Sequence, residues 1–270
     1  MAMLPGSVFE FTSRFLPAGL AEKLVSIYAL RQAITSIPCT AADDSVKWAK
    51  LKWWREELTA DPCSTSRHPI LRAMHHSGAR NKLGEGLLQR LLADAVMQMD
   101  VFPDPDRQTL YSRLAVQGET DILLELALDE AEISTQNLQA FSLATGLFAM
   151  ISGFLPGYQS KIHQLPLDML AQYQVNAPHL EQHPPVSELA GIVKQLAGSG
   201  VDSYDKGMSG LTESGGGGVP MHLLLRFAVE SRRLQSISEN TQRSFGELSP
   251  YGPSYAWFAW KFCRRLNRSQ

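Results

Sequence analysis

Residues 51–58 read LKWWREEL, and the apolar side chains of Leu51, Trp54 and Leu58 recur there at steps of three and four. This spacing puts the three side chains on one face of an α-helix, which has 3.6 residues per turn. An aspartate pair at 43–44 supplies a suitable residue to cap the start of the helix. The stretch therefore predicts an amphipathic helix that packs its apolar face on a core.

The same spacing recurs along the whole chain, whereas the alternation typical of β-strands is scarce. Helices are expected at 20–37, 44–61, 69–76, 86–99, 107–128, 136–155, 166–172, 186–196, 221–237 and 253–267. The stretch 198–219 is rich in Gly and Ser and ends in four consecutive glycines, so it is expected to be a mobile loop. The sequence predicts an all-α fold in which residues 1–270 form a single domain.

Composition narrows the class of protein. The 270 residues carry a net charge of −2, so the general attraction to phosphate backbones shown by nucleic-acid-binding proteins is not expected. The longest apolar stretch, at 141–156, is shorter than the roughly 20 residues that a membrane span needs. Three cysteines without a CxxC pair suit a reducing compartment, and we expect a cytoplasmic protein.

Five segments together carry a more specific signal: Phe15-Leu16-Pro17, Ile27-Tyr28-Ala29-Leu30, residues 51–58, His68-Pro69 and residues 165–170, which read LPLDML. In this order and spacing they resemble the squalene/phytoene synthase family. The resemblance extends over most of the chain, from about residue 8 to residue 237. It implies a helical bundle of the isoprenoid synthase type.

Members of that family condense two prenyl diphosphates head to head. The resemblance implies two aspartate-rich motifs on facing helices, which hold magnesium ions that bind and ionise the diphosphate. Carboxylates are needed there because magnesium prefers hard oxygen ligands and because the leaving group carries several negative charges into an apolar cavity.

Both aspartate motifs are degenerate in this chain. Aligned from the YAL segment, the first motif includes Thr35, Ser36 and Cys39 and no carboxylate, and the two aspartates of the second fall on Gly153 and Gly157. Without a nearby histidine pattern, Cys39 is expected to be a small buried residue rather than a nucleophile. The resemblance predicts that neither metal site is present.

The resemblance also indicates which residues line a cavity between the helices. These residues are Tyr28, Ile34, Val116, Gln117 and Phe148. The family usually has small residues in the middle helix where this chain has Val116 and Gln117, so an isoprenoid tunnel would be narrower here.

Loss of both motifs predicts a family member without prenyl-transfer chemistry, which acts by binding. The bound molecule is expected to be a protein client, in an assembly or scaffold role, or an isoprenoid lipid in the remnant cavity. A branch of the family that serves as a complex I assembly factor in mitochondria lacks the same aspartates. No cofactor is expected.

One alternative is an active prenyl-condensing transferase with a non-standard metal site. Asp121, Glu125 and Asp129 follow each other at steps of four, which puts three carboxylates on one helix face and could hold magnesium. The favoured interpretation of the same spacing is a solvated acidic face on the bundle.

A second alternative is a peripheral membrane adaptor on the inner face of a membrane. The segment 253–267 combines Trp257 and Trp260 with basic residues that include Arg264 and Arg265. Tryptophan beside arginine is typical of helices that contact a membrane surface or a partner protein. The other interpretation is a final helix that closes the bundle.

Overall fold

The computed structural model describes residues 8–40, 43–60, 66–99, 104–129, 131–155, 164–175, 186–213, 219–244 and 253–269. These ranges contain helices and no strand, which confirms the predicted all-α class. The helices are α1 (Val8–Ser13), α2 (Ala18–Thr35), α3 (Asp44–Thr59), α4 (Pro69–His76), the 3₁₀ helix η1 (Arg80–Lys82), α5 (Glu85–Met99), α6 (Arg107–Asp129), α7 (Thr135–Phe154), α8 (Leu167–Gln172), α10 (Val186–Glu213), α11 (Met221–Glu239), α12 (Thr241–Ser244) and α13 (Pro253–Ser269).

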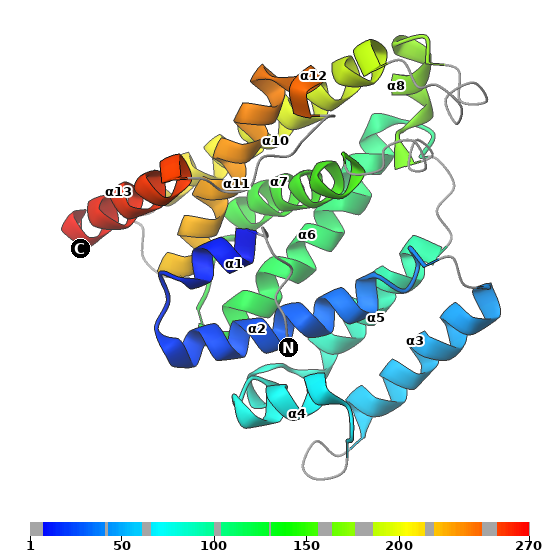
Figure 1. Cartoon of the computed structure of the whole chain (residues 1–270), viewed down its shortest axis with the longest axis vertical. Helices are drawn as coiled ribbons and strands as arrows, with labels where there is room; N and C mark the ends of the chain where they lie inside the picture. Colours follow the sequence, from blue (N-terminus) through cyan, green and yellow to red (C-terminus); the bar gives the residue numbers. More distant parts are fainter. Residues whose placement is uncertain are drawn as a thin grey trace.

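The helices pack as a bundle around α6 and α7, which lie side by side at its centre (Figure 1). Helix α10 packs between α7 and α11, while α2 and α5 contact α6 from the other side. Helices α3 and α4 lie outside α5 and α2, and α13 packs on α11 and ends away from the centre of the bundle (Figure 1). The middle of the molecule is therefore bounded by α2, α6, α7, α10 and α11.

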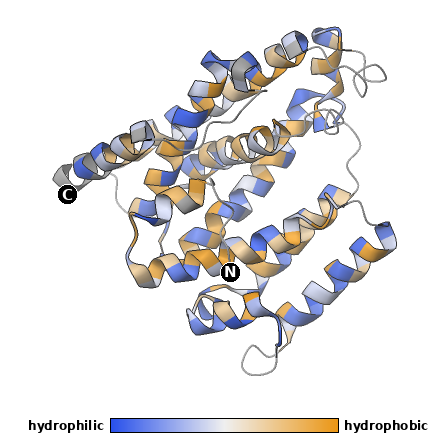
Figure 2. Cartoon of the chain, in the orientation of Figure 1, coloured by the Kyte–Doolittle hydropathy of each residue, from blue (hydrophilic) through white to orange (hydrophobic). Residues whose placement is uncertain are grey.

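Helix α6 separates two apolar clusters. On one side Leu114 and Ile122 join the cluster formed mainly by α7, α10 and α11. On the other side Leu124 and Leu128 join the cluster formed mainly by α2, α3, α4 and α5. Buried hydrophobic residues accordingly make up the interior of the bundle. Hydrophobic and hydrophilic residues alternate along the outer helices (Figure 2). Polar side chains of α6 that lie between the two clusters are therefore buried inside the bundle.

The central contact between α6 and α7 depends on two glycines. A Cβ atom at Gly118 would fall on the carbonyl oxygen of Ser142, and one at Gly146 would fall on that of Leu114. The absence of side chains at these positions lets the two helix backbones touch. This contact fixes the position of α6 along α7.

The predicted loop at 198–219 is wrong over most of its length, because α10 continues to Glu213. Two of its glycines are packing positions: a Cβ atom at Gly207 would meet the ring of Phe141, and one at Gly200 would meet Leu234. Small residues were therefore selected by close helix packing rather than by a turn. Residues 214–218, which include the four glycines, lie outside the described residues.

Candidate functional site

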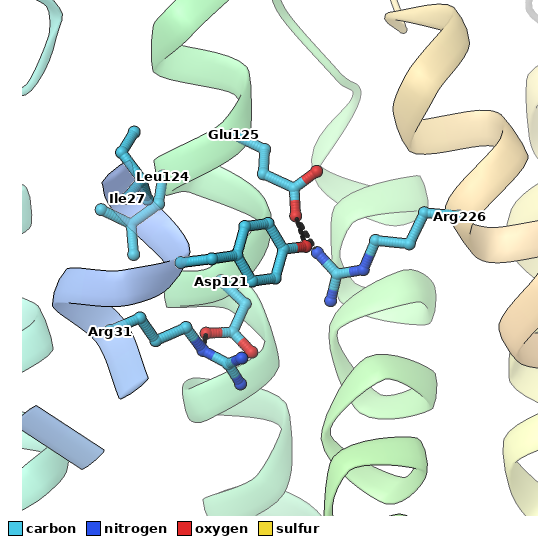
Figure 3. Close-up of a pocket in the computed structure, with 7 residues that line it drawn as sticks. Ile27, Arg31, Asp121, Leu124, Glu125 and Arg226 are labelled. Carbon is cyan, nitrogen blue, oxygen red and sulfur yellow. Dashed lines mark hydrogen bonds and ion pairs between the residues drawn. The ribbon is translucent and has the colours of Figure 1, made fainter. Parts of the chain in front are cut away.

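The site is built on the buried face of α6. Asp121 is 7% exposed and Glu125 is 3% exposed, so the expected solvated acidic face is wrong for these two residues. The Tyr28 hydroxyl, from α2, donates a hydrogen bond of 2.5 Å to Glu125 Oε1. Arg226 of α11 reaches the same oxygen through its Nη1 atom, as Figure 3 shows.

Arg226 links α6 to the far side of the bundle. Its Nε atom donates to Glu230 Oε1 over 2.7 Å, one turn further along α11. The hydroxyl of Tyr204, from α10, donates to the other oxygen of Glu230. Tyr28 is half-buried and the other groups are buried, so a chain of charge-assisted hydrogen bonds joins α2, α6, α11 and α10 through the interior.

The other carboxylates of α6 have partners as well. Asp121 pairs with Nε of Arg31, which comes from α2 (Figure 3). His222 of α11 lies between two carboxylates, with Nε2 3.6 Å from Glu125 Oε2 and Nδ1 3.4 Å from Asp129 Oδ2. The side chain of Asp129 is 32% exposed and lies at the edge of this cluster.

Burial sets the protonation behaviour of the cluster. It raises the pKa of Asp121 and that of Glu230, while Arg31 and Arg226 oppose this rise at their respective partners. Burial alone would lower the pKa of Arg226, but Glu125 and Glu230 more than offset this and leave it well above its ordinary value. The guanidinium therefore stays charged and acts as the fixed cation of the site.

Little space is left beside these groups. A void of about 10 Å³ is lined by Tyr28, Arg31, Asp121, Glu125, Arg226 and the apolar residues Ile27 and Leu124 (Figure 3). That volume is close to the minimum for one water molecule, whereas ligand pockets typically measure about 300–1,000 Å³. Neither a prenyl chain nor a diphosphate fits between these side chains as they stand.

The carboxylates of this site pair with arginines and, in the described residues, are not grouped as metal ligands. Among the described residues there is no group of three or more His, Cys, Asp and Glu side chains placed to hold one ion. Two arginines, Arg31 and Arg226, pair with Asp121, Glu125 and Glu230 instead. Most of the negative charge that a divalent cation would require is therefore already neutralised.

The positions of the first degenerate motif lie at the end of α2. The hydroxyl of Thr35 donates to the carbonyl of Arg31 over 2.9 Å, and that of Ser36 donates to Ala33 over 3.3 Å. Cys39 is exposed and its thiol is free, so the expectation of a buried residue is wrong. In the second motif Gly153 is an exposed residue near the end of α7, and Gly157 lies outside the described residues.

Of the five residues expected along a cavity, Tyr28 lines the void. Ile34 is fully buried in the α2-side cluster, and Phe148 is buried in the α7-side cluster. Val116 is 37% exposed, and Gln117 is half-buried with its Nε2 atom buried and without a hydrogen bond. The structure thus places these five residues in different surroundings instead of along one wall.

A larger groove lies between α5, α6 and the segment that leads into α7. Its volume is about 570 Å³, and none of its lining residues borders the small void. The lining is mostly apolar, with two charged side chains from Arg90 and Glu132. The other lining residues are Gly86, Leu87, Leu123, Leu126, Ala127, Ala131, Ile133 and Leu138. The groove could enclose an apolar chain but has no carboxylate cluster to bind magnesium.

Comparison with known proteins agrees with this architecture. The sequence model of the family described as squalene/phytoene synthase matches residues 5–249. The chain belongs to the squalene/phytoene synthase family. No curated protein sequence is similar enough to the chain to serve as a comparison.

Two solved structures of the family show the same fold. A dehydrosqualene synthase in complex with a ligand has a TM-score of 0.74 and 14% sequence identity, over 97% of this chain and 92% of the other. Squalene synthase HpnC from Alicyclobacillus acidocaldarius has a TM-score of 0.67 and 14% identity, over 88% of this chain and 89% of the other. The bundle described above is therefore the isoprenoid synthase fold.

Sequence reasoning missed Arg226, which pairs with Glu125 of α6, and its second partner Glu230. Arg226 and Glu230 stand four residues apart on α11, among apolar residues such as Leu225, Phe227 and Val229. An arginine and a glutamate at this spacing inside an apolar run are the signal that could have identified a buried ion pair. Nothing in the sequence indicates that their partner is Glu125, 101 residues away.

Proposed function

We propose that this family member acts by binding another molecule and not by prenyl transfer. The observation that carries the proposal is the pairing of Arg226 with Glu125 and Glu230 at the centre of the bundle. A guanidinium already neutralises the carboxylates of α6, the group that a non-standard metal site would need to bind a divalent cation.

The free energy of the buried ion pairs favours keeping Arg226 between Glu125 and Glu230. Removing Arg226 from its partners would leave two buried carboxylates without a counter-charge, which costs several kcal/mol, about 3–5 for a broken buried pair. A magnesium diphosphate entering this centre would have to overcome that cost and also open a cavity where about 10 Å³ is free. These costs support a structural role for the site and a function without prenyl transfer.

The surface of α3 supports a protein client, in an assembly or scaffold role. This helix buries a narrow stripe of three apolar residues. Val46, Trp48 and Trp53 stay 43%, 46% and 38% exposed, and α3 lies at the edge of the bundle (Figure 1). Exposed aromatic side chains on one helix are typical of surfaces that bind another protein.

An isoprenoid lipid is the second candidate ligand. The observation that favours it is the apolar groove of about 570 Å³ between α5, α6 and the start of α7, which is large enough for a prenyl chain. Because it lacks carboxylates for a metal, it would take a prenyl alcohol or a lipid tail and not perform ionisation chemistry on a diphosphate.

Incubation of the purified chain with magnesium and farnesyl or geranylgeranyl diphosphate tests the catalytic question. We expect no diphosphate release and no squalene or phytoene above a protein-free blank, while an active squalene synthase run in parallel gives product. Product that is lost in Glu125→Gln but kept in Asp205→Asn, an exposed carboxylate of α10, would instead support the enzyme alternative.

Native mass spectrometry with geranylgeraniol separates the two kinds of ligand. If the groove holds a prenyl chain, the alcohol binds the wild-type chain and Ala171→Trp, an exposed control on α8, but not Ala131→Trp, which fills the groove. If the alcohol binds none of the three, the lipid candidate is excluded and the protein client stands.

A further inference from the structure

Helix α13 is attached to the bundle by one face. Tyr255 and Ala259 are 9% and 0% exposed, and both belong to the apolar cluster around α7, α10 and α11. Arg232 of α11 reinforces the attachment, since its guanidinium carbon lies 4.6 Å from the ring centre of Phe258. The helix therefore has a fixed orientation and presents a defined outer face.

The outer face carries two large aromatic side chains. Trp257 is 57% exposed and Trp260 is 50% exposed. Among the described residues, no other exposed Phe or Trp side chain reaches these values. Each is accompanied by a cation: Lys261 Nζ lies 4.1 Å from the ring centre of Trp257, and the guanidinium carbon of Arg264 lies 5.1 Å from that of Trp260. These four side chains are called the α13 face below.

The charge of α13 is of one sign. The helix reads PSYAWFAWKFCRRLNRS, with one lysine, three arginines and no acidic residue in 17 positions. Arg265, expected from the sequence to contribute to the same contact, has its side chain outside the described residues. A net charge of +4 on one helix contrasts with a net charge of −2 for the whole chain. No acidic residue within α13 balances these four positive charges.

We infer that the α13 face docks on the surface of a membrane that contains anionic phospholipids. Indole rings lie stably at the depth of lipid headgroups, and the lysine and arginine stems beside them extend their charges to the phosphates. A convex face on a single helix suits a flat, fluid surface, which needs no matching pocket to receive two tryptophans.

The described helices include none that is both long and apolar enough to cross a membrane, so the contact is peripheral. Several basic residues and a few interfacial aromatics give reversible binding that weakens with salt. The inference is independent of whether the chain catalyses a reaction, because α13 shares no residue with the cluster around Arg226.

Vesicle co-sedimentation of the full chain tests the inference. We expect the chain to pellet with vesicles of phosphatidylcholine containing about 30% phosphatidylglycerol, not with pure phosphatidylcholine, and to be released at about 0.5 M salt. Trp257→Ser with Trp260→Ser should weaken binding about tenfold, and Lys261→Glu with Arg264→Glu about 25-fold or more, since each basic residue contributes about fivefold. Met97→Ser, at an exposed apolar side chain of α5, serves as the control and should bind as the wild type does.

Circular dichroism confirms that each variant is folded before it is compared. The inference is overturned if the wild-type chain does not pellet with anionic vesicles. It is also overturned if the charge-reversed variant and the wild type pellet equally, or if Met97→Ser loses binding to the same extent as the Trp257 and Trp260 variant. The first of these outcomes would leave an acidic protein surface as the complement of α13.

Discussion

Two of the arginines that lie against an aromatic ring, Arg226 and Arg264, have opposite surroundings. The guanidinium carbon of Arg226 is 5.9 Å from the ring centre of Tyr28, and its side chain is 7% exposed. The guanidinium carbon of Arg264 is 5.1 Å from the ring centre of Trp260, on the outer side of α13. The geometry of the two contacts is similar, but their environments are not.

The difference lies in the neighbouring carboxylates. Glu125 and Glu230 neutralise Arg226, whereas α13 contains no acidic residue at all. A buried charge that is already paired holds the fold together and is not available to a ligand. An exposed charge without a partner on its own helix contributes little to folding and remains available for binding. We therefore expect substitutions in the two regions to affect different properties.

The largest effect is expected from Arg226→Met, which leaves two buried carboxylates without their cation. The free energy of unfolding should fall by about 3–5 kcal/mol at pH 7. Urea denaturation monitored by circular dichroism measures the loss.

A double-mutant cycle with Glu125→Gln sharpens this prediction. If the two side chains are coupled as described, the double variant loses clearly less stability than the sum of the single variants. A loss below about 1 kcal/mol for Arg226→Met, or strict additivity in the cycle, would contradict the interior pairing.

An intermediate effect on the free energy of unfolding is expected from Asp94→Asn. Asp94 is a buried carboxylate of α5, and the arginine near it, Arg90, pairs with Glu119 instead. Asp94 is 4% exposed, and Arg90 pairs with Glu119 at 2.9 Å. Burial raises the pKa of Asp94 from 3.8 to about 6. The folded state thus binds a proton more tightly than the unfolded state, so this residue reduces stability as the pH rises from about 4 to above 6.

Replacement by Asn removes that dependence. Once solvent screening is allowed for, Asp94→Asn should raise the free energy of unfolding by about 1–2 kcal/mol at pH 7. Below about pH 3 the gain should vanish, because Asp94 is then protonated in both states. Urea denaturation at a series of pH values measures the difference, and an equal gain at all pH values would rule out titration of Asp94 as its cause.

The smallest effect is expected from Arg264→Ala, the exterior counterpart of Arg226→Met. Because this side chain is exposed and has no carboxylate on its own helix, the free energy of unfolding should change by less than about 0.5 kcal/mol. The same denaturation experiment provides the comparison. A loss similar to that of Arg226→Met would show that the two arginines do not differ as described.

The fold could be predicted largely from the sequence, because helix signals are local. The helix predicted at 69–76 is observed with the same bounds, Pro69–His76, and has a proline in its first turn. The error at α10 also has a local cause: glycines such as Gly207 were interpreted by their conformational freedom, although packing against Phe141 requires them. The family resemblance, carried by ordered motifs, identified the bundle itself.

The site could be predicted only in part, because its pairing is not local. The spacing of Asp121 and Glu125 correctly placed both on one face of a helix. Their burial depends on Arg31 and Arg226, which come from two other helices at opposite ends of the sequence. A single sequence does not reveal which distant cation neutralises which carboxylate, so a buried and paired face was interpreted as a solvated one.

The most direct test of the account is a crystal structure of the chain soaked with manganese and a non-hydrolysable thio analogue of farnesyl diphosphate. Anomalous scattering locates manganese without ambiguity. The account predicts no anomalous peak beside Asp121 and Glu125, with Arg226 still bonded to Glu125 and Glu230. A manganese ion bound to these carboxylates, with Arg226 displaced and the analogue next to it, would contradict it.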